Sequence, residues 1–183
     1  MSTFLFTSKQ QILELIREAD DYSETQNLIN ELKQLKQERI PFYLKKEEFD
    51  KILNWKLRQQ RGRQKQLREQ NTDEIIRQIT RTAFEINHSD WHYETELKFK
   101  ILTALRGVAI SVASAILTLC YPEKYAVIDF RVWRQLFENT RTYYSLNNYL
   151  KYLDIIRNTA ENYDLSPQQV DQAIWQYDIQ VNG

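Results

Sequence analysis

Between Ser111 and Cys120 the chain contains a helical segment whose apolar residues cover nearly every side. These residues are Val112, Ala113, Ala115, Ile116, Leu117 and Leu119. A helix that is apolar all round has to be buried all round, because none of its faces is suited to water. The segment therefore predicts a central helix around which the other elements pack.

Apolar residues elsewhere recur at the three- and four-residue spacing of amphipathic helices. Such stripes run through residues 12–19, 28–35, 49–57, 75–83, 97–105, 132–137, 146–153 and 170–177. Residues suited to an N-cap precede several of them, namely Ser8, Asn71 (with Glu74 in a capping-box pattern), Asp90, Ser145 and Ser166. With three glycines and three prolines in 183 residues, the chain lacks the turn residues of a β-sandwich or barrel. We expect an all-α fold of about nine helices in a single unit spanning residues 1–183.

The composition narrows the range of functions. Cys120 is the sole cysteine, which excludes an intrachain disulfide, a four-cysteine zinc site and an iron–sulfur cluster held by cysteines of this chain. The longest apolar run, residues 107–120, falls short of the roughly 20 residues that span a bilayer, and residues 1–6 are too short for a secretory signal. We expect a reduced, cytoplasmic protein with no membrane partner and no cofactor. The 25 basic residues equal the 25 acidic ones, so nucleic-acid binding requires a local basic patch.

A tight connection precedes the buried helix at Arg106, Gly107, Val108 and Ala109. Gly107 is one of two internal glycines, and it predicts a backbone conformation or a close approach that a Cβ atom would forbid. Two helices joined this tightly leave the first N–H groups of the second helix, from Ser111 onward, pointing outward. Such groups bind anions, and a nucleic-acid phosphate is the leading candidate.

Asp129 follows three apolar residues at the predicted start of a short helix over residues 130–137. One interpretation is an N-cap whose carboxylate accepts hydrogen bonds from backbone N–H groups. The other is a catalytic carboxylate held near the mouth of a cleft. The local sequence by itself favours the cap.

Together these features resemble the helix-hairpin-helix DNA glycosylase superfamily, to which endonuclease III belongs. Residues 105–109, Leu-Arg-Gly-Val-Ala, are similar to the superfamily's Leu-x-Gly-Val-Gly hairpin. Residues 127–132, Val-Ile-Asp-Phe-Arg-Val, are similar to its Val-Asp-x-x-Val block, and the spacing from hairpin to aspartate also fits. The detailed likeness covers about 30 residues.

The resemblance implies that backbone amides of the hairpin grip DNA phosphate and that Asp129 supports the departure of a flipped-out base. A fixed carboxylate suits this chemistry, because cleavage of the glycosidic bond develops positive charge on the sugar. Members that also cut the strand carry a lysine where this chain has Ser111, so no Schiff base and no AP lyase activity are expected. Ala109 replaces the usual second hairpin glycine, and its Cβ works against close approach of a phosphate. Aromatic candidates for a base pocket are Trp55, Trp91, Tyr125 and Trp133, with core packing as the alternative.

The segment from Lys56 to Arg68 contains six basic residues and no acid. The residues predicted here to contact the DNA backbone are Arg61, Arg63 and Lys65. The alternative is a solvated helix end whose charge is balanced by Glu47, Glu48 and Asp50. Arg106 and Arg131 complete the predicted DNA-binding set, and for Arg131 the alternative is an ion pair with an acid.

His88 and His92 are four residues apart, a spacing that suits metal ligands on one helix. Residues 87–90, however, have the composition of a turn and a helix cap, so the two rings are not expected to share a face. No metal site is therefore predicted.

By the resemblance, residues 72–140 form a central lobe with the hairpin, and residues 1–71 and 141–183 form a second helical lobe. The leading hypothesis is a DNA-binding protein of the glycosylase superfamily, acting in base-excision repair on damaged or mismatched duplex DNA as a monofunctional N-glycosylase through Asp129. One alternative is a DNA-binding module that keeps the fold without catalysis. Another is a helical interaction protein, in which Gly107 only makes a turn and Asp129 only caps a helix.

Overall fold

The computed structural model describes residues 6–58, 62 and 65–183. These residues contain ten helices and no strand, which confirms the predicted all-α class. The helices are α1 (Lys9–Glu18), α2 (Tyr22–Glu38), α3 (Lys46–Lys56), α4 (Lys65–Arg68), α5 (Asp73–Glu85), α6 (Trp91–Leu102), α7 (Ile110–Cys120), α8 (Phe130–Phe137), α9 (Leu146–Tyr163) and α10 (Pro167–Asn182). In the part of the chain described, no helix has both the length and the apolar content that crossing a bilayer requires.

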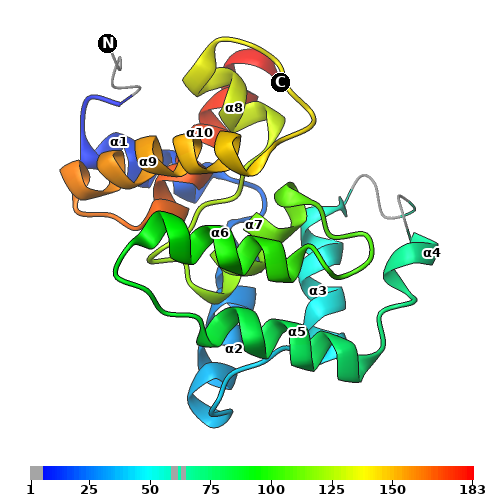
Figure 1. The fold of residues 1–183 in the computed structure, drawn as a ribbon. Helices are drawn as coiled ribbons and strands as arrows, with labels where there is room; N and C mark the ends of the chain where they lie inside the picture. The colour runs from blue at the N-terminus through cyan, green and yellow to red at the C-terminus, as the bar shows by residue number, and fades with distance from the viewer. Residues whose placement is uncertain (1–5, 59–61, 63–64) are drawn as a thin grey trace.

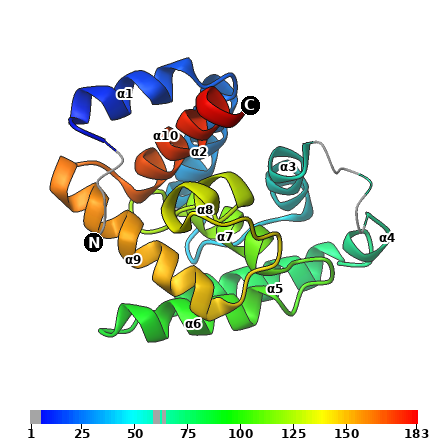
Figure 2. The ribbon, with the colours of Figure 1, turned by 90° about the horizontal axis from the view of Figure 1, so that it is seen from above.

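Helix α7 lies at the centre of the molecule in both views (Figure 1 and Figure 2). Every residue from Val112 to Cys120 is buried, as the all-round apolar pattern predicts. Helices α2, α3 and α6 pack against α7, and α5 packs against α3 and α6. Helix α7 begins at Ile110, one residue before the predicted start at Ser111.

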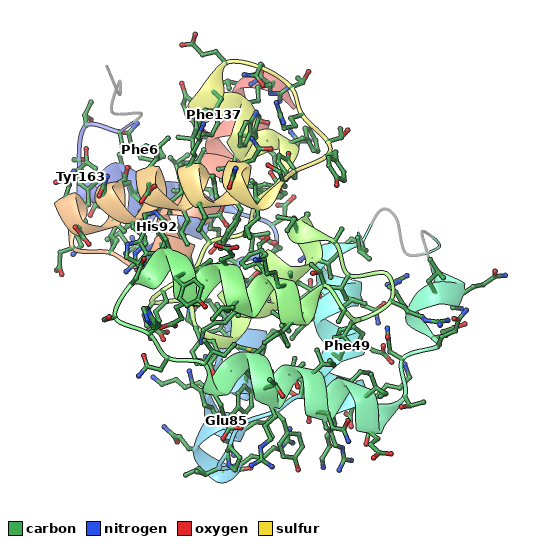
Figure 3. The ribbon with its side chains drawn as sticks, viewed as in Figure 1. Phe6, Phe49, Glu85, His92, Phe137 and Tyr163 are labelled. Atoms are coloured by element: carbon green, nitrogen blue, oxygen red, sulfur yellow. The ribbon has the colours of Figure 1, made fainter. Side chains whose placement is uncertain are left out.

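A second group of helices packs around α10, at the top of Figure 1. Helices α1, α8 and α9 all contact α10, and α9 also contacts α6 of the first group. Figure 3 marks this junction with His92, whose Nε2 lies 3.2 Å from the carboxylate of Asp154 on α9. Helix contacts join the two expected lobes. Helices α2 and α3, within residues 1–71, contact α7, and α8, within residues 72–140, contacts α10.

Local capping explains where most of the helices begin. Side-chain oxygens accept backbone N–H groups at the starts of α1, α6, α9 and α10, and they belong to the predicted residues Ser8, Asp90, Ser145 and Ser166. The prediction for α5 is wrong, since Thr72 and not Asn71 is its N-cap and accepts the N–H of Ile75. Asn71 binds the hairpin before α7 instead.

Candidate nucleic-acid interface and carboxylate site

The connection between α6 and α7 makes the sharp turn that the sequence predicts. Helix α6 ends at Leu102, three residues before the predicted end at Leu105. Gly107 has a φ of +76°, a left-handed conformation that residues with a side chain rarely adopt. A Cβ atom on Gly107 would also lie 2.6 Å from Cγ of Arg68. Both predicted reasons for a glycine, its conformation and a close approach, therefore hold at this position.

Asn71 holds the hairpin by its backbone. Its Oδ1 accepts a hydrogen bond from the Arg106 amide at 2.9 Å, and its Nδ2 donates to the Arg106 carbonyl at 2.8 Å. The same Nδ2 donates to the carbonyl of Arg68 at 3.1 Å, and the Arg106 guanidinium contacts the side chain of Gln70. These bonds place the end of the basic tract directly against the hairpin.

The first turn of α7 begins without a side-chain cap. Its N-cap residue is Ala109, which is exposed and carries no side-chain oxygen. The amide of Val108 is already used, because it donates to the carbonyl of Leu105 at 3.1 Å. The first amides of an α-helix have no partner within the helix, so the start of α7 presents donors suited to an anion.

Asp129 lies next to this first turn of α7. The Ser111 hydroxyl donates a hydrogen bond to the carbonyl of Ile128 at 3.1 Å. The Ser114 hydroxyl oxygen accepts one from the amide of Ile128, also at 3.1 Å. Because both serines belong to the first turns of α7, they tie the residue before Asp129 to the start of the hairpin's second helix.

The two carboxylate oxygens of Asp129 have different environments. Oδ1 accepts hydrogen bonds from the amides of Arg131 at 3.0 Å and Val132 at 3.1 Å, so Asp129 is the N-cap of α8. Oδ2 lies 3.9 Å from Nζ of Lys56, and the Asp129 side chain is 20% exposed. The cap interpretation therefore describes one oxygen, while the other faces a lysine at a partly open position.

Lys56 is a residue of this site that the sequence reasoning did not connect with Asp129. It ends α3, its side chain is only 11% exposed, and its Nζ lies 3.5 Å from the carbonyl oxygen of Ile128. Its membership of the acid-free tract was the one available signal. No local pattern indicates which acid a lysine will meet when more than 70 residues separate them.

The predicted DNA-contacting residues occupy different surroundings. Arg61 and Arg63 lie outside the described residues. Lys65 is exposed on α4, where it forms a surface ion pair with Glu69 at 3.6 Å. Arg131 pairs with Asp178 at 3.1 Å, which is the alternative interpretation given for it above.

The acids expected to balance the basic tract pair with other cations. Glu47 pairs with Lys51, Glu48 with Arg39 and Asp50 with Lys46. Within the tract, Arg58 pairs with Asp21 and Glu24 at the start of α2. The ion pairs of the tract residues Lys56, Arg58 and Lys65 are therefore formed with acids other than Glu47, Glu48 and Asp50.

Asp178 on α10 anchors α8, the helix that Asp129 caps. Its side chain is fully buried and accepts hydrogen bonds from Arg131, Arg134 and Gln135, the shortest at 2.6 Å. Burial opposes ionisation of this carboxyl group, but the hydrogen bonds outweigh it and hold the pKa of Asp178 below its usual value. The start of α8, and with it Asp129, is thus held firmly against α10.

The aromatic candidates for a base pocket have packing partners. The indole N–H groups of Trp55 and Trp133 donate to Thr25 and Asn139, Trp91 stacks on His92, and Tyr125 is buried. A surface cleft of about 260 Å³ lies elsewhere, lined by residues of α1, α2 and the start of α10 together with Pro122.

The described residues contain no group of three or more His, Cys, Asp or Glu side chains placed to hold a metal ion. The ring of His88 bonds to the backbone of Asp90, whereas that of His92 faces Asp154. Cys120 is buried, and burial raises the pKa of its thiol.

Comparison with protein-family models, with curated proteins and with solved structures finds no match to this chain.

Proposed function

We propose that this chain is a DNA-binding protein of the helix-hairpin-helix glycosylase superfamily and that it releases damaged or mismatched bases through Asp129. The observation that carries the proposal is the hydrogen bond from Ser111 to the carbonyl of Ile128, which brings Asp129 beside the hairpin. An enzyme that grips a phosphate and acts on an adjoining sugar needs its anion-binding turn and its carboxylate close together.

The hairpin supplies the elements of a phosphate contact. Gly107 gives the tight turn, and the uncapped start of α7 presents backbone donors. The exposed side chain of Arg106 adds positive charge at the hairpin, and the acid-free sequence of residues 56–68 supplies further basic residues. A local patch of this kind supports DNA binding although the whole chain has no net charge.

Asp129 has the chemistry that base release requires. When the bond between the sugar C1′ and the base nitrogen breaks, the base leaves with the electron pair and the sugar becomes cationic. Oδ2 of Asp129 stabilises this cation until water adds to C1′. The proton that the water loses is taken up by the departed base, which yields the free base and an abasic site. Oδ1 is held by two amides of α8, so the direction of Oδ2 is set before substrate arrives. This role requires the sugar to displace the Lys56 ammonium group, whose Nζ lies 3.9 Å from Oδ2.

The test uses duplexes that carry uracil, hypoxanthine, oxidised bases, alkylated bases or mismatches, followed by hot alkali to cut abasic sites. Asp129→Asn is the decisive variant, because asparagine still caps a helix but has no charge. Asp164→Asn, at an exposed residue, is the matched control. We expect scission by the unmodified chain and the control only after alkali, and a loss of at least about 100-fold in Asp129→Asn.

Full activity of Asp129→Asn would contradict the role of Asp129. Absence of cleavage with every lesion would contradict the enzymatic part of the proposal. Scission without alkali would contradict the monofunctional assignment, which follows from Ser111 at the position where strand-cutting members carry lysine.

The second candidate is a DNA-binding module without catalysis. It is favoured by the use of Asp129 as an N-cap and as a partner of Lys56, since a purely structural carboxylate has the same contacts. This candidate predicts salt-dependent DNA binding without base release, measured by fluorescence anisotropy across a salt series. Charge reversal at Arg61, Arg63 and Lys65 should weaken binding and flatten its salt dependence. Lack of retention on DNA at low salt would contradict both candidates.

A further inference from the structure

A buried carboxyl group that the proposed reaction does not use joins three parts of the fold near Asp129. Asp171 lies on α10 and is 7% exposed. Its Oδ2 accepts a hydrogen bond from the amide of Val127 at 3.0 Å, and its Oδ1 lies 2.7 Å from the hydroxyl oxygen of Tyr152 on α9. Asp171 thus connects α10 and α9 to the segment that leads into Asp129.

The protons in this cluster can be counted. The Tyr152 hydroxyl lies 3.0 Å from the carbonyl oxygen of Val127 and 2.7 Å from Oδ1 of Asp171. A tyrosine hydroxyl carries one proton, and a carbonyl oxygen carries none. Both contacts are therefore full hydrogen bonds only when Asp171 supplies the second proton. The ring then closes, because Val127 N–H donates to Asp171, Asp171 O–H donates to Tyr152, and Tyr152 O–H donates to the Val127 carbonyl.

The surroundings also disfavour a negative charge on Asp171. The titratable and charged groups that influence it are Tyr149 and Tyr152 of α9, Asp129 at the start of α8, and Lys56 of α3. Burial, followed by the negative charge of Asp129, raises the pKa of Asp171 to about 8. The hydrogen bonds from Tyr152 and Val127 and the charge of Lys56 act in the opposite direction without outweighing these two causes.

The segment that Asp171 binds, residues 126–128, has a backbone hydrogen bond to a side chain at each of its three residues. The Tyr149 hydroxyl donates to the carbonyl of Ala126 at 3.1 Å. The backbone of Val127 binds Asp171 and Tyr152, and that of Ile128 binds Ser114 and Ser111. A change of protonation near neutral pH can alter the hydrogen bonds of Asp171. The other side chains that bind this segment are the hydroxyl groups of two tyrosines and two serines.

We propose that Asp171 is a positioning residue that acts in its protonated form, donating a hydrogen bond to Tyr152 and thereby fixing the segment that aims Asp129. Loss of this proton leaves two acceptors facing the single proton of Tyr152 and adds a charge to the interior, so the segment loosens. The role of Asp129 rests on the proposed function, whereas the location of the proton does not.

The test follows the full chain by NMR through a pH titration, with ¹³C in the aspartate carboxyl groups and ¹⁵N in the backbone. We expect a carboxyl resonance that is absent from Asp171→Asn and titrates near pH 8. The amide resonances of Arg131 and Val132, which donate to Asp129, should shift with the same midpoint. In Asp171→Asn they should stay constant, because the asparagine amide replaces the donor and cannot ionise. Asp164→Asn, the exposed control, should titrate like the unmodified chain.

An Asp171 resonance already ionised below about pH 6 would overturn the proposal, and so would amides of Arg131 and Val132 that ignore the titration. Base release is followed over the same range, where the unmodified chain should lose activity as Asp171 ionises and Asp171→Asn should retain it. If the chain cleaves no lesion but shows the expected NMR titration, the proposed function is wrong and the proposal that protonated Asp171 fixes the segment stands. An active chain in which Asp171→Asn loses activity over the same pH range shows that Asp171 does not position Asp129.

Discussion

The Ser111 hydroxyl donates a hydrogen bond at 3.1 Å to the carbonyl oxygen of Ile128, the residue immediately before Asp129. This bond couples the first turn of the buried helix to the N-cap of α8. The same carbonyl oxygen lies 3.5 Å from Nζ of Lys56, so the end of α3 meets the two other elements at this point. The hairpin, the basic tract and the carboxylate are therefore linked through one peptide group.

Replacement of Ser111 by alanine should destabilise the chain by about 1 kcal/mol, because the partly buried carbonyl of Ile128 loses its closer donor. Urea denaturation measures the change. The matched control is Ser89→Ala, at an exposed residue of the turn before α6, which should stay within about 0.5 kcal/mol of the unmodified chain. Equal effects of the two substitutions would show that the Ser111 bond contributes no stability.

Substitution by alanine should affect the stability of the chain differently at its two internal glycines, Gly107 and Gly62. Gly107→Ala should cost about 1–2 kcal/mol from its positive φ alone, with further cost from the contact with Arg68. Gly62→Ala is the control, because nothing lies within 4 Å of a Cβ atom there. Thermal or urea unfolding tests stability, and anisotropy tests DNA binding, which should weaken only in Gly107→Ala. A Gly107→Ala chain as stable as Gly62→Ala would contradict the constraint at the hairpin.

Two substitutions of Asp129 separate the stability that it contributes as the N-cap of α8 from the stability that its charge contributes. Asp129→Ala should lower stability by about 1 kcal/mol, because the amides of Arg131 and Val132 lose their acceptor. Asp129→Asn should cost only a few tenths of a kcal/mol, since asparagine is an equally good N-cap. Urea denaturation of the unmodified chain and the two variants measures the free energies of unfolding. Equal losses of stability in the two variants would mean that the charge of Asp129, and not its role as N-cap, stabilises the fold.

The buried cluster around Asp178 predicts an acid-sensitive contribution to stability. Asp178→Ala should cost about 3–5 kcal/mol, because Arg131 and Arg134 lose their buried partner. The pKa of Asp178 is lowered in the fold, so its contribution is present above the usual value of 3.8 and is lost as pH falls through the folded-state pKa. Urea denaturation over the acidic range measures how the free energy of unfolding depends on pH. The same dependence in the unmodified chain and in Asp178→Asn would refute the prediction.

Asp171 predicts the opposite dependence on pH. Its folded-state pKa of about 8 lies above the usual 3.8, so between these values the folded chain holds a proton that the unfolded chain has released. Its contribution is therefore fully present below about pH 4 and falls as pH rises, by up to about 1.4 kcal/mol per pH unit, until about pH 8. The difference in unfolding free energy between the unmodified chain and Asp171→Asn isolates this slope. A difference that does not vary with pH would contradict it.

The helices and their caps were largely predictable, because each depends on residues within one or two turns. Ser8, Ser145 and Ser166 begin the helices expected of them, and residues 112–120 are buried as their composition requires. Asn71 shows the limit of this reasoning. Its residue type suits an N-cap, but Thr72 takes that role one position later and Asn71 bonds to Arg106, 35 residues away.

Within the candidate site, the sequence by itself determined the turn at Gly107 and the capping carboxylate at Asp129, since both follow from the conformational and hydrogen-bonding properties of a few adjacent residues. Only the tertiary structure decided that Lys56 faces Asp129, that Arg131 pairs with Asp178, and that Asp171 binds Tyr152 and Val127. These contacts join residues far apart in the chain. They depend on the relative positions of packed helices, which a periodic pattern within each helix does not specify.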